Sequence, residues 1–161
     1  FSSHLQTAAR RDDMVTTVGN ETTMGDLVEN LLLLEHDAIA AYEQTIARLE
    51  NASWKQQVSA FKADHDRHVQ ELTALASRIG ARVPQQGDMK QMLTTGKVAL
   101  ASMMGDKTIL SAMRTNEEDT VTAYDRASRN QDATPEARQI FQRAHADELR
   151  HREWMATTAS A

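Results

Sequence analysis

A sequence pattern that occurs twice constrains the fold of this chain more than any other feature. Residues 35–43 read Glu-His-Asp-Ala-Ile-Ala-Ala-Tyr-Glu, and residues 117–125 read Glu-Glu-Asp-Thr-Val-Thr-Ala-Tyr-Asp. A second pattern follows each copy, namely Phe61-x-x-x-His65-x-x-His68-x-x-Glu71 and then Phe141-x-x-x-His145-x-x-Glu148-x-x-His151. Glu and His are exchanged at the last two positions. A duplicated helical hairpin with Glu on one helix and Glu or His on the next is a known way to build a carboxylate metal site in a helix bundle.

The composition narrows the classes of protein to which the chain can belong. Its 161 residues suit one domain with an adequate core. Because Cys is absent, disulfides, thiolate metal sites and Cys nucleophiles are excluded, which fits a reducing compartment and predicts a cytoplasmic location. The net charge of -5, with Lys and Arg scattered, predicts neither a nucleic-acid partner nor a membrane surface. The longest apolar run, residues 31–34, is too short to span a bilayer.

Helix-forming residues dominate, and no long stretch alternates with period two, so we predict an all-α protein. The apolar spacing places four main helices at about residues 24–50, 54–79, 107–129 and 135–157, and a short helix at 88–104. Short links within each pair make the pairs antiparallel, whereas roughly 25 residues between the second and third helices allow a crossover along the bundle. Residues 23–158 form this four-helix bundle, and residues 1–22 form an arm or a partial extra helix.

Capping signals support these boundaries. Thr23 with Asp26 resembles a capping box, and Thr134 precedes a Pro at the first helical position. Ser53 and Asp106 are the predicted caps of the second and third helices, and Gly80 is the predicted stop of the second. The sequence therefore predicts both ends of the two hairpins.

Each main helix carries ionisable residues in its apolar stripe near mid-length: Glu35, then His65 with His68, then Glu117, then Glu148 with His151. Counting residues from each Glu to the hairpin turn and back places these side chains at one level, because a helix advances ~1.5 Å per residue. An unpaired charge inside a bundle costs several kcal/mol. Four such helices need a common partner, and oxygen and imidazole ligands suit Fe, Mn or Zn.

At this point the chain resembles the ferritin-like superfamily, including bacterioferritins, rubrerythrins and uncharacterised bacterial ferritin-like domains. In that superfamily the first and third helices each supply a Glu, often with a Tyr seven residues later, and the other two each supply Glu-x-x-His. The resemblance implies a ferritin-like bundle with up to two metal ions, held by Glu35, His68, Glu71, Glu117, Glu148 and His151. Tyr42 and Tyr124 would lie beside the metals as candidate catalytic residues, and His65 and His145 are possible extra ligands.

The second helix departs from the family pattern, since His68-Val69-Gln70-Glu71 stands where Glu-x-x-His is expected. The inventory of four carboxylates and two imidazoles survives, but the order is reversed. Either Glu71 bridges from one turn away, or the site is mononuclear, asymmetric or lost.

Simpler interpretations accompany the metal hypothesis. Tyr42 and Tyr124 fit packed core aromatics with bonded hydroxyls. His65 and His145 fit histidines at the edge of the core that bond to acids such as Asp64 or Asp147, which otherwise belong to charged, solvated faces.

Two functions follow from this sequence. The first is a carboxylate/histidine metal-binding protein with iron as the favoured metal. It would act with O₂ or peroxide in metal or oxidative-stress handling, and any enzymatic activity would be of the ferroxidase or peroxidase type. The second is a metal-free structural or interaction bundle without enzymatic activity. A homo-oligomer is expected, with a dimer favoured, while metal identity, metal number and substrate stay open.

Overall fold

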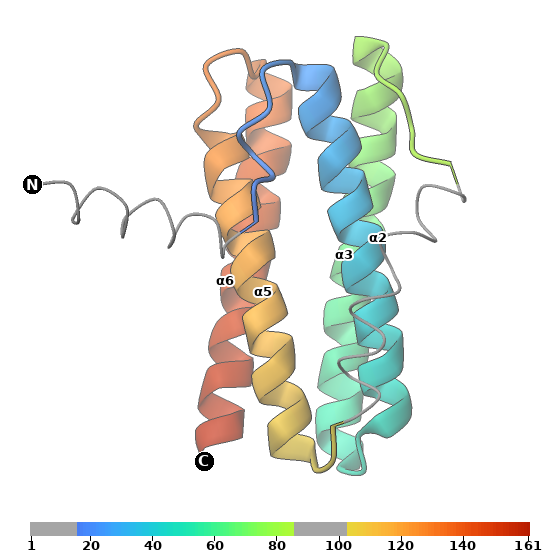
Figure 1. Ribbon diagram of the computed structural model, residues 1–161, viewed down its shortest axis with the longest axis vertical. Helices are drawn as coiled ribbons and strands as arrows, with labels where there is room; N and C mark the ends of the chain where they lie inside the picture. The colour runs from blue at the N-terminus through green and yellow to red at the C-terminus, as the bar shows by residue number, and fades with distance from the viewer. Residues whose placement is uncertain (1–15, 86–102) are drawn as a thin grey trace, which may run out of the picture.

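The computed structural model describes residues 16–85 and 103–161. These residues form four α-helices and no strand: α2 (Met24–Arg48), α3 (Ala52–Ile79), α5 (Asp106–Ser128) and α6 (Pro135–Ser160). The helices lie side by side along one long axis (Figure 1). The predicted all-α four-helix bundle is confirmed. Among the described helices, none is both long and apolar enough to cross a membrane.

The connections give the bundle its topology. The helices contact one another in the cyclic order α2, α3, α6, α5. Residues 49–51 and 129–134 are short links, so α2 and α3 run antiparallel, as do α5 and α6. In contrast, α3 ends and α5 begins at opposite ends of the bundle, as the long crossover requires (Figure 1). The short helix predicted at 88–104 lies almost wholly outside the described residues, and residues 103 and 104 are not helical.

Three of the predicted helix boundaries are confirmed. Thr23 accepts the backbone N–H of Asp26 at 3.1 Å, and Thr134 accepts that of Ala137 at 3.2 Å. Each bond satisfies one of the N–H groups that the first turn of a helix leaves free. Gly80 ends α3 with φ of 69°, a left-handed conformation that a residue without Cβ adopts at little cost.

Two predicted caps were wrong. Helix α3 begins two residues earlier than Ser53 implies, because the Asn51 side chain accepts a backbone N–H three residues later. Helix α5 has Gly105 as its N-cap, and Asp106 is its first helical residue. The Asp106 carboxylate is instead engaged by the backbone N–H groups of Glu50 and Asn51, at 3.0 and 2.9 Å. It therefore joins the start of α5 to the turn between α2 and α3.

The segment before α2 lies against α5. The guanidinium of Arg126 donates to the carbonyl of Val18 at 3.2 Å, and the N–H of Thr16 donates to Asp119 at 3.3 Å. Gly19 has φ of 106°, and a Cβ there would lie 2.4 Å from the Arg126 side chain. A glycine is needed where the segment turns over α5. Of the predicted arm, residues 1–15 lie outside the described residues.

The interior has two apolar clusters with a polar layer between them. One cluster is built around Leu27, Leu31, Leu72 and Phe141, and the other around Tyr42, Phe61, Met113 and Met155. On every helix the buried ionisable residues, joined on α5 by Thr120, fall between the positions that belong to the two clusters. We call this layer the buried polar cluster; it consists of Glu35, His65, His68, Glu117, Thr120, Glu148 and His151.

Candidate metal centre

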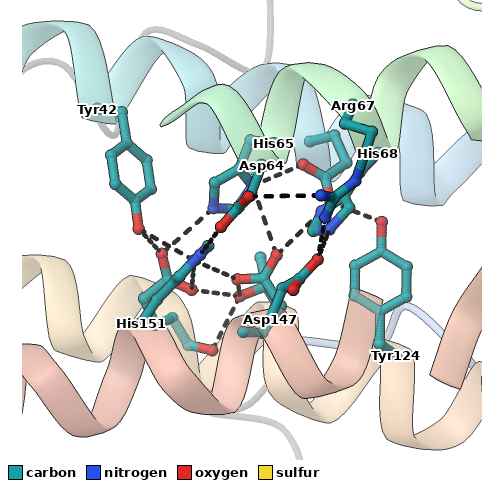
Figure 2. Close-up of polar contacts among 12 residues, drawn as sticks. Tyr42, Asp64, His65, Arg67, His68, Tyr124, Asp147 and His151 are labelled. Carbon is teal, nitrogen blue, oxygen red and sulfur yellow. Dashed lines mark hydrogen bonds and ion pairs between the residues drawn. The ribbon is translucent and has the colours of Figure 1, made fainter. Parts of the chain in front are cut away.

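All four helices contribute to the buried polar cluster (Figure 2). Each helix turns an ionisable residue inward because that residue occupies a position of its apolar stripe. Every member of the cluster is at most 2% exposed. Burying carboxylates and imidazoles without partners would cost several kcal/mol each, so their mutual contacts decide whether the bundle is stable.

One half of the cluster is centred on Glu35. Its Oε1 accepts the hydroxyl of Tyr124 at 2.6 Å and lies 3.0 Å from Nδ1 of His68. Its Oε2 lies 2.6 Å from Nδ1 of His65. The carboxylate of α2 is therefore held by one residue of α5 and by two imidazoles of α3.

The other half is centred on Glu117 of α5. Its Oε1 accepts the hydroxyl of Tyr42 and lies 3.4 Å from Nε2 of His65. Its Oε2 accepts the hydroxyl of Thr120 at 3.1 Å and lies 3.8 Å from Nδ1 of His151. Each half thus pairs a Glu with a Tyr from the opposite hairpin, and His65 contacts both halves.

Glu148 of α6 also lies between the halves. Its Oε2 accepts the hydroxyl of Thr120 at 3.0 Å and lies 3.5 Å from Nδ1 of His151. Its Oε1 lies 3.4 Å from Nδ1 of His68 and 3.5 Å from Nδ1 of His65, without hydrogen bonding to either. Within the described residues, Oε1 of Glu148 is the buried side-chain oxygen or nitrogen that lacks a hydrogen-bond partner. A buried oxygen without a partner is costly, and a cation would remove that cost.

Two aspartates fix the outer sides of the imidazoles. Nε2 of His68 lies 2.8 Å from Asp147, and Nε2 of His151 lies 2.8 Å from Asp64. Arg150 donates to both aspartates, at 2.9 and 3.0 Å, from the surface side of the cluster. Figure 2 shows the two histidines and the two aspartates together, with Arg67 contributing to the same network. An imidazole whose Nε2 is held in this way presents its Nδ1 to the inside of the cluster. Outer carboxylates orient metal-binding histidines in the same manner.

These contacts reveal an approximate twofold relation that differs from the repeat in the sequence. Asp64 of α3 contacts His151 of α6, and Asp147 of α6 contacts His68 of α3. The segments that correspond to one another are therefore Asp64-His65-x-x-His68 and Asp147-Glu148-x-x-His151. The repeat anchored on phenylalanine pairs His65 with His145 instead. In the structure His65 occupies the place that Glu148 has on α6.

The cluster contains two groups whose ligand atoms lie within 4.8 Å of one another. One consists of Glu35, His65, His68 and Glu148, and the other of His65, Glu117, Glu148 and His151. Both are fully buried, and they share His65 and Glu148. Each combines carboxylate oxygen with imidazole nitrogen, a ligand set that suits Fe, Mn and Zn. The cluster can therefore hold a metal ion.

The imidazoles of the cluster bind protons tightly when no cation competes. Burial lowers the pKa of His68, but hydrogen bonds to Asp147 and other carboxylates raise it to about 11. Burial also lowers the pKa of His151, whereas Glu117 and Glu148 raise it to about 9. A metal ion must displace these protons, so its affinity depends on pH.

The carboxylates are not equivalent. Burial raises the pKa of Glu35, but the charge and hydrogen bonds of His65, together with His68, lower it to about 2. For Glu148, burial and the neighbouring charge of Glu117 raise the pKa above its ordinary value. Glu148 is therefore the carboxylate whose ionised form is least well compensated.

Two of the residues predicted as possible ligands lie outside both groups. Glu71 is one turn beyond His68 on α3, its side chain is 25% exposed, and it pairs with Arg143 at 3.5 Å. His145 is half-buried on α6. Glu71, His68 and Asp147 line a surface cavity of about 310 Å³ together with Arg67 and Arg143. This cavity reaches the outer side of one imidazole.

The sequence pointed to Asp64 and Asp147 only as partners of His65 and His145, whereas they contact His151 and His68. Thr120 was not predicted as part of the site. The aspartates are 18% and 19% exposed, and each stands at the edge of its helix's buried stripe. Aligning the two histidine-containing helices on Asp-x-x-x-His, rather than on phenylalanine, would have indicated both. The sequence carries no comparable signal for Thr120.

Comparisons with known proteins place the chain in a family. No curated protein and no solved structure matches it significantly. A family model described as a domain of unknown function, DUF2383, matches residues 23–130. This match spans α2, α3 and α5, including Glu35, His65, His68 and Glu117. Because it covers more than half of the sequence, the chain belongs to the DUF2383 family.

Proposed function

We propose that this chain is a ferritin-like metal-binding protein whose buried polar cluster holds two ions, with iron as the favoured metal. The observation that carries the proposal is a pair of adjacent four-ligand groups that share a carboxylate with an unpartnered oxygen, Oε1 of Glu148. The all-α bundle with one long crossover supports the superfamily assignment.

The residues of the cluster would have different roles in such a centre. Glu35 with His68, and Glu117 with His151, would hold one ion each, and Glu148 would face both. The aspartates behind the two histidines orient their rings. Tyr42 and Tyr124 each donate a hydroxyl to one outer carboxylate, which fixes its position.

A redox-active ion such as iron would supply one-electron chemistry with O₂ or peroxide at this centre. The buried cluster excludes bulk water, and the cavity beside His68 gives small molecules a route to its edge. We therefore propose a role in metal or oxidative-stress handling, with ferroxidase or peroxidase activity. A cytoplasmic location and a homodimer belong to the same proposal.

A metal-free structural bundle is the second candidate. The observation in its favour is that three buried carboxylates face three buried histidines, whose protonated forms balance their charge. Almost every polar atom of this network is hydrogen-bonded without a cation. In this case the cluster would act as an internal salt-bridge network.

Metal-dependent melting distinguishes the two. Under anaerobic conditions, Fe(II) at 100 times its dissociation constant should stabilise the fold by about 2.7 kcal/mol for each ion bound, and chelator should reverse the effect. The double substitution Glu35→Ala/Glu117→Ala should abolish both the shift and the binding, whereas Glu71→Ala, outside both groups, should retain them. A midpoint that responds to neither metal nor chelator would favour the metal-free network, and unchanged stoichiometry in the double variant would refute the assignment.

A further inference from the structure

His65 has a position that a metal ligand serving one ion would not need. Its side chain is fully buried at the centre of the bundle, and its two ring nitrogens face different halves of the cluster. Nδ1 lies 2.6 Å from Glu35 of α2, and Nε2 lies 3.4 Å from Glu117 of α5. The ring centroid is 4.8 Å from that of Tyr42 and 5.3 Å from that of His151, so aromatic neighbours hold its orientation.

The corresponding residue on α6, Glu148, indicates which kind of side chain the position of His65 needs. His65 and Glu148 correspond in the Asp-x-x-x-His alignment of the two helices, and both belong to both four-ligand groups. Glu148 turns one oxygen towards each half. An imidazole has a ring nitrogen on each of two sides, and both nitrogens can be ligand atoms once the ring has lost its N–H proton.

Charge balance supports the same role. Glu35, Glu117 and Glu148 supply three negative charges to the interior, whereas two divalent cations supply four positive ones. A ring that binds a cation through each nitrogen has lost its remaining N–H proton to solvent and carries the fourth negative charge. That charge would balance the two ions within the buried cluster, since the outer aspartates Asp64 and Asp147 are paired with Arg150 at the surface.

We infer that His65 bridges two divalent cations, with Nδ1 on the Glu35–His68 side and Nε2 on the Glu117–His151 side. This inference rests on the proposed metal-binding function. It also gives the reversed order of His68 and Glu71 a physical explanation, because the position that a bridging carboxylate would occupy lies at residue 65 and is filled by an imidazole.

The test uses Co(II) alone as the probe, with elemental analysis for stoichiometry and electron paramagnetic resonance for coupling between ions. The wild type should bind two Co(II) ions that are magnetically coupled through the shared ring. His65→Gln keeps a polar side chain of similar size but cannot bridge as an anion, and it should lose the second ion and the coupling. His145→Gln, on a histidine outside both groups, is the matched control and should behave as the wild type.

His65→Glu keeps the test decisive if the glutamine variant unfolds, which circular dichroism would reveal. A carboxylate at this position restores both the charge and two ligand atoms, so this variant should bind two ions with altered coupling. Two coupled ions of unchanged spectrum in either His65 variant would overturn the bridge. A single ion in the wild type would overturn the bridge but retain the metal centre, whereas no ion in any form would overturn the proposed function itself.

Discussion

The two halves of the buried polar cluster are alike at their edges and different at their centre. In each half a Glu accepts a Tyr hydroxyl from the opposite hairpin, and a His is backed by an Asp across the contact between α3 and α6. At the centre, α6 contributes Glu148 and α3 contributes His65. Residues that serve one half are therefore duplicated, whereas those that serve both have diverged. Substitutions can separate half-specific effects from shared ones.

The largest effect is expected from the shared carboxylate. Glu148→Gln should weaken both ions by more than about 100-fold, because even an outer partner of a metal ligand is worth about 10–100-fold. Without metal, the same variant should be as stable as the wild type or more stable by about 1 kcal/mol, since a poorly compensated buried carboxylate is removed. Isothermal titration calorimetry and chemical denaturation measure the two effects. Unaltered binding would show that Glu148 is not shared.

Substitutions in one half should leave the other half intact. Glu35→Gln and Glu117→Gln should each reduce the stoichiometry by one ion, because each carboxylate belongs to one four-ligand group. Elemental analysis after metal loading measures this directly, and the two variants serve as controls for each other. If either variant lost both ions, the halves would not be separable.

The outer aspartates should tune affinity without changing stoichiometry. Asp64→Asn and Asp147→Asn should each weaken one ion by about 10–100-fold, because the ring of His151 or His68 loses the carboxylate that orients it. Competition with a chromophoric chelator measures the change. Asp66→Asn is a control on a surface residue that pairs with Lys62. An equal effect of the control would indicate a general loss of negative charge.

Metal affinity should rise with pH. In the metal-free protein the pKa of His151 is raised to about 9, so below that pH a cation must displace at least this proton, and affinity should increase by at least about tenfold per pH unit. The same proton stabilises the metal-free fold fully below the ordinary pKa of about 6.5, and this contribution is lost as pH rises through about 9. Titrations between these values, with melting of the metal-free form, measure both trends. A pH-independent affinity would mean that this imidazole is not a ligand.

The smallest effect on metal binding should come from the tyrosines, because they belong to neither four-ligand group. Tyr42→Phe and Tyr124→Phe each remove a hydrogen bond to a buried carboxylate and should destabilise the metal-free fold by about 1.5–3 kcal/mol. Because the two hydroxyls serve different halves, the double variant should show nearly additive losses in chemical denaturation. Strong non-additivity would show that the halves are coupled through the centre.

Much of the fold was predictable because local chemistry determines it. The caps at Thr23 and Thr134 and the stop at Gly80 depend on residues within one turn, and all three are confirmed. The start of α5 was not predictable in this way. The carboxylate of Asp106 is bonded to a turn more than 50 residues away in sequence, and this tertiary contact prevents it from capping its own helix.

In the candidate site, too, local patterns were predictable and contacts between distant parts of the chain were not. Periodicity placed Glu35, Glu117 and Glu148 in the core seams, and all three are buried together. Periodicity could not decide which turn of α3 lies level with them, because a shift of three residues keeps nearly the same helix face. The relative depth of α3 and α6 depends on packing between hairpins. The resemblance to the superfamily put Glu71 among the ligands and His65 among the possible extras, although periodicity had already placed His65 in the apolar stripe. The structure brings His65 to the centre.

Iron loading tests the central claim most directly. Purified protein would be treated with anaerobic Fe(II), passed through a desalting column and analysed for bound iron, with and without prior chelator. The two four-ligand groups, which share His65 and Glu148, predict about two iron ions per chain. No retained iron, even after loading, would contradict the metal centre and leave the buried cluster as a salt-bridge network.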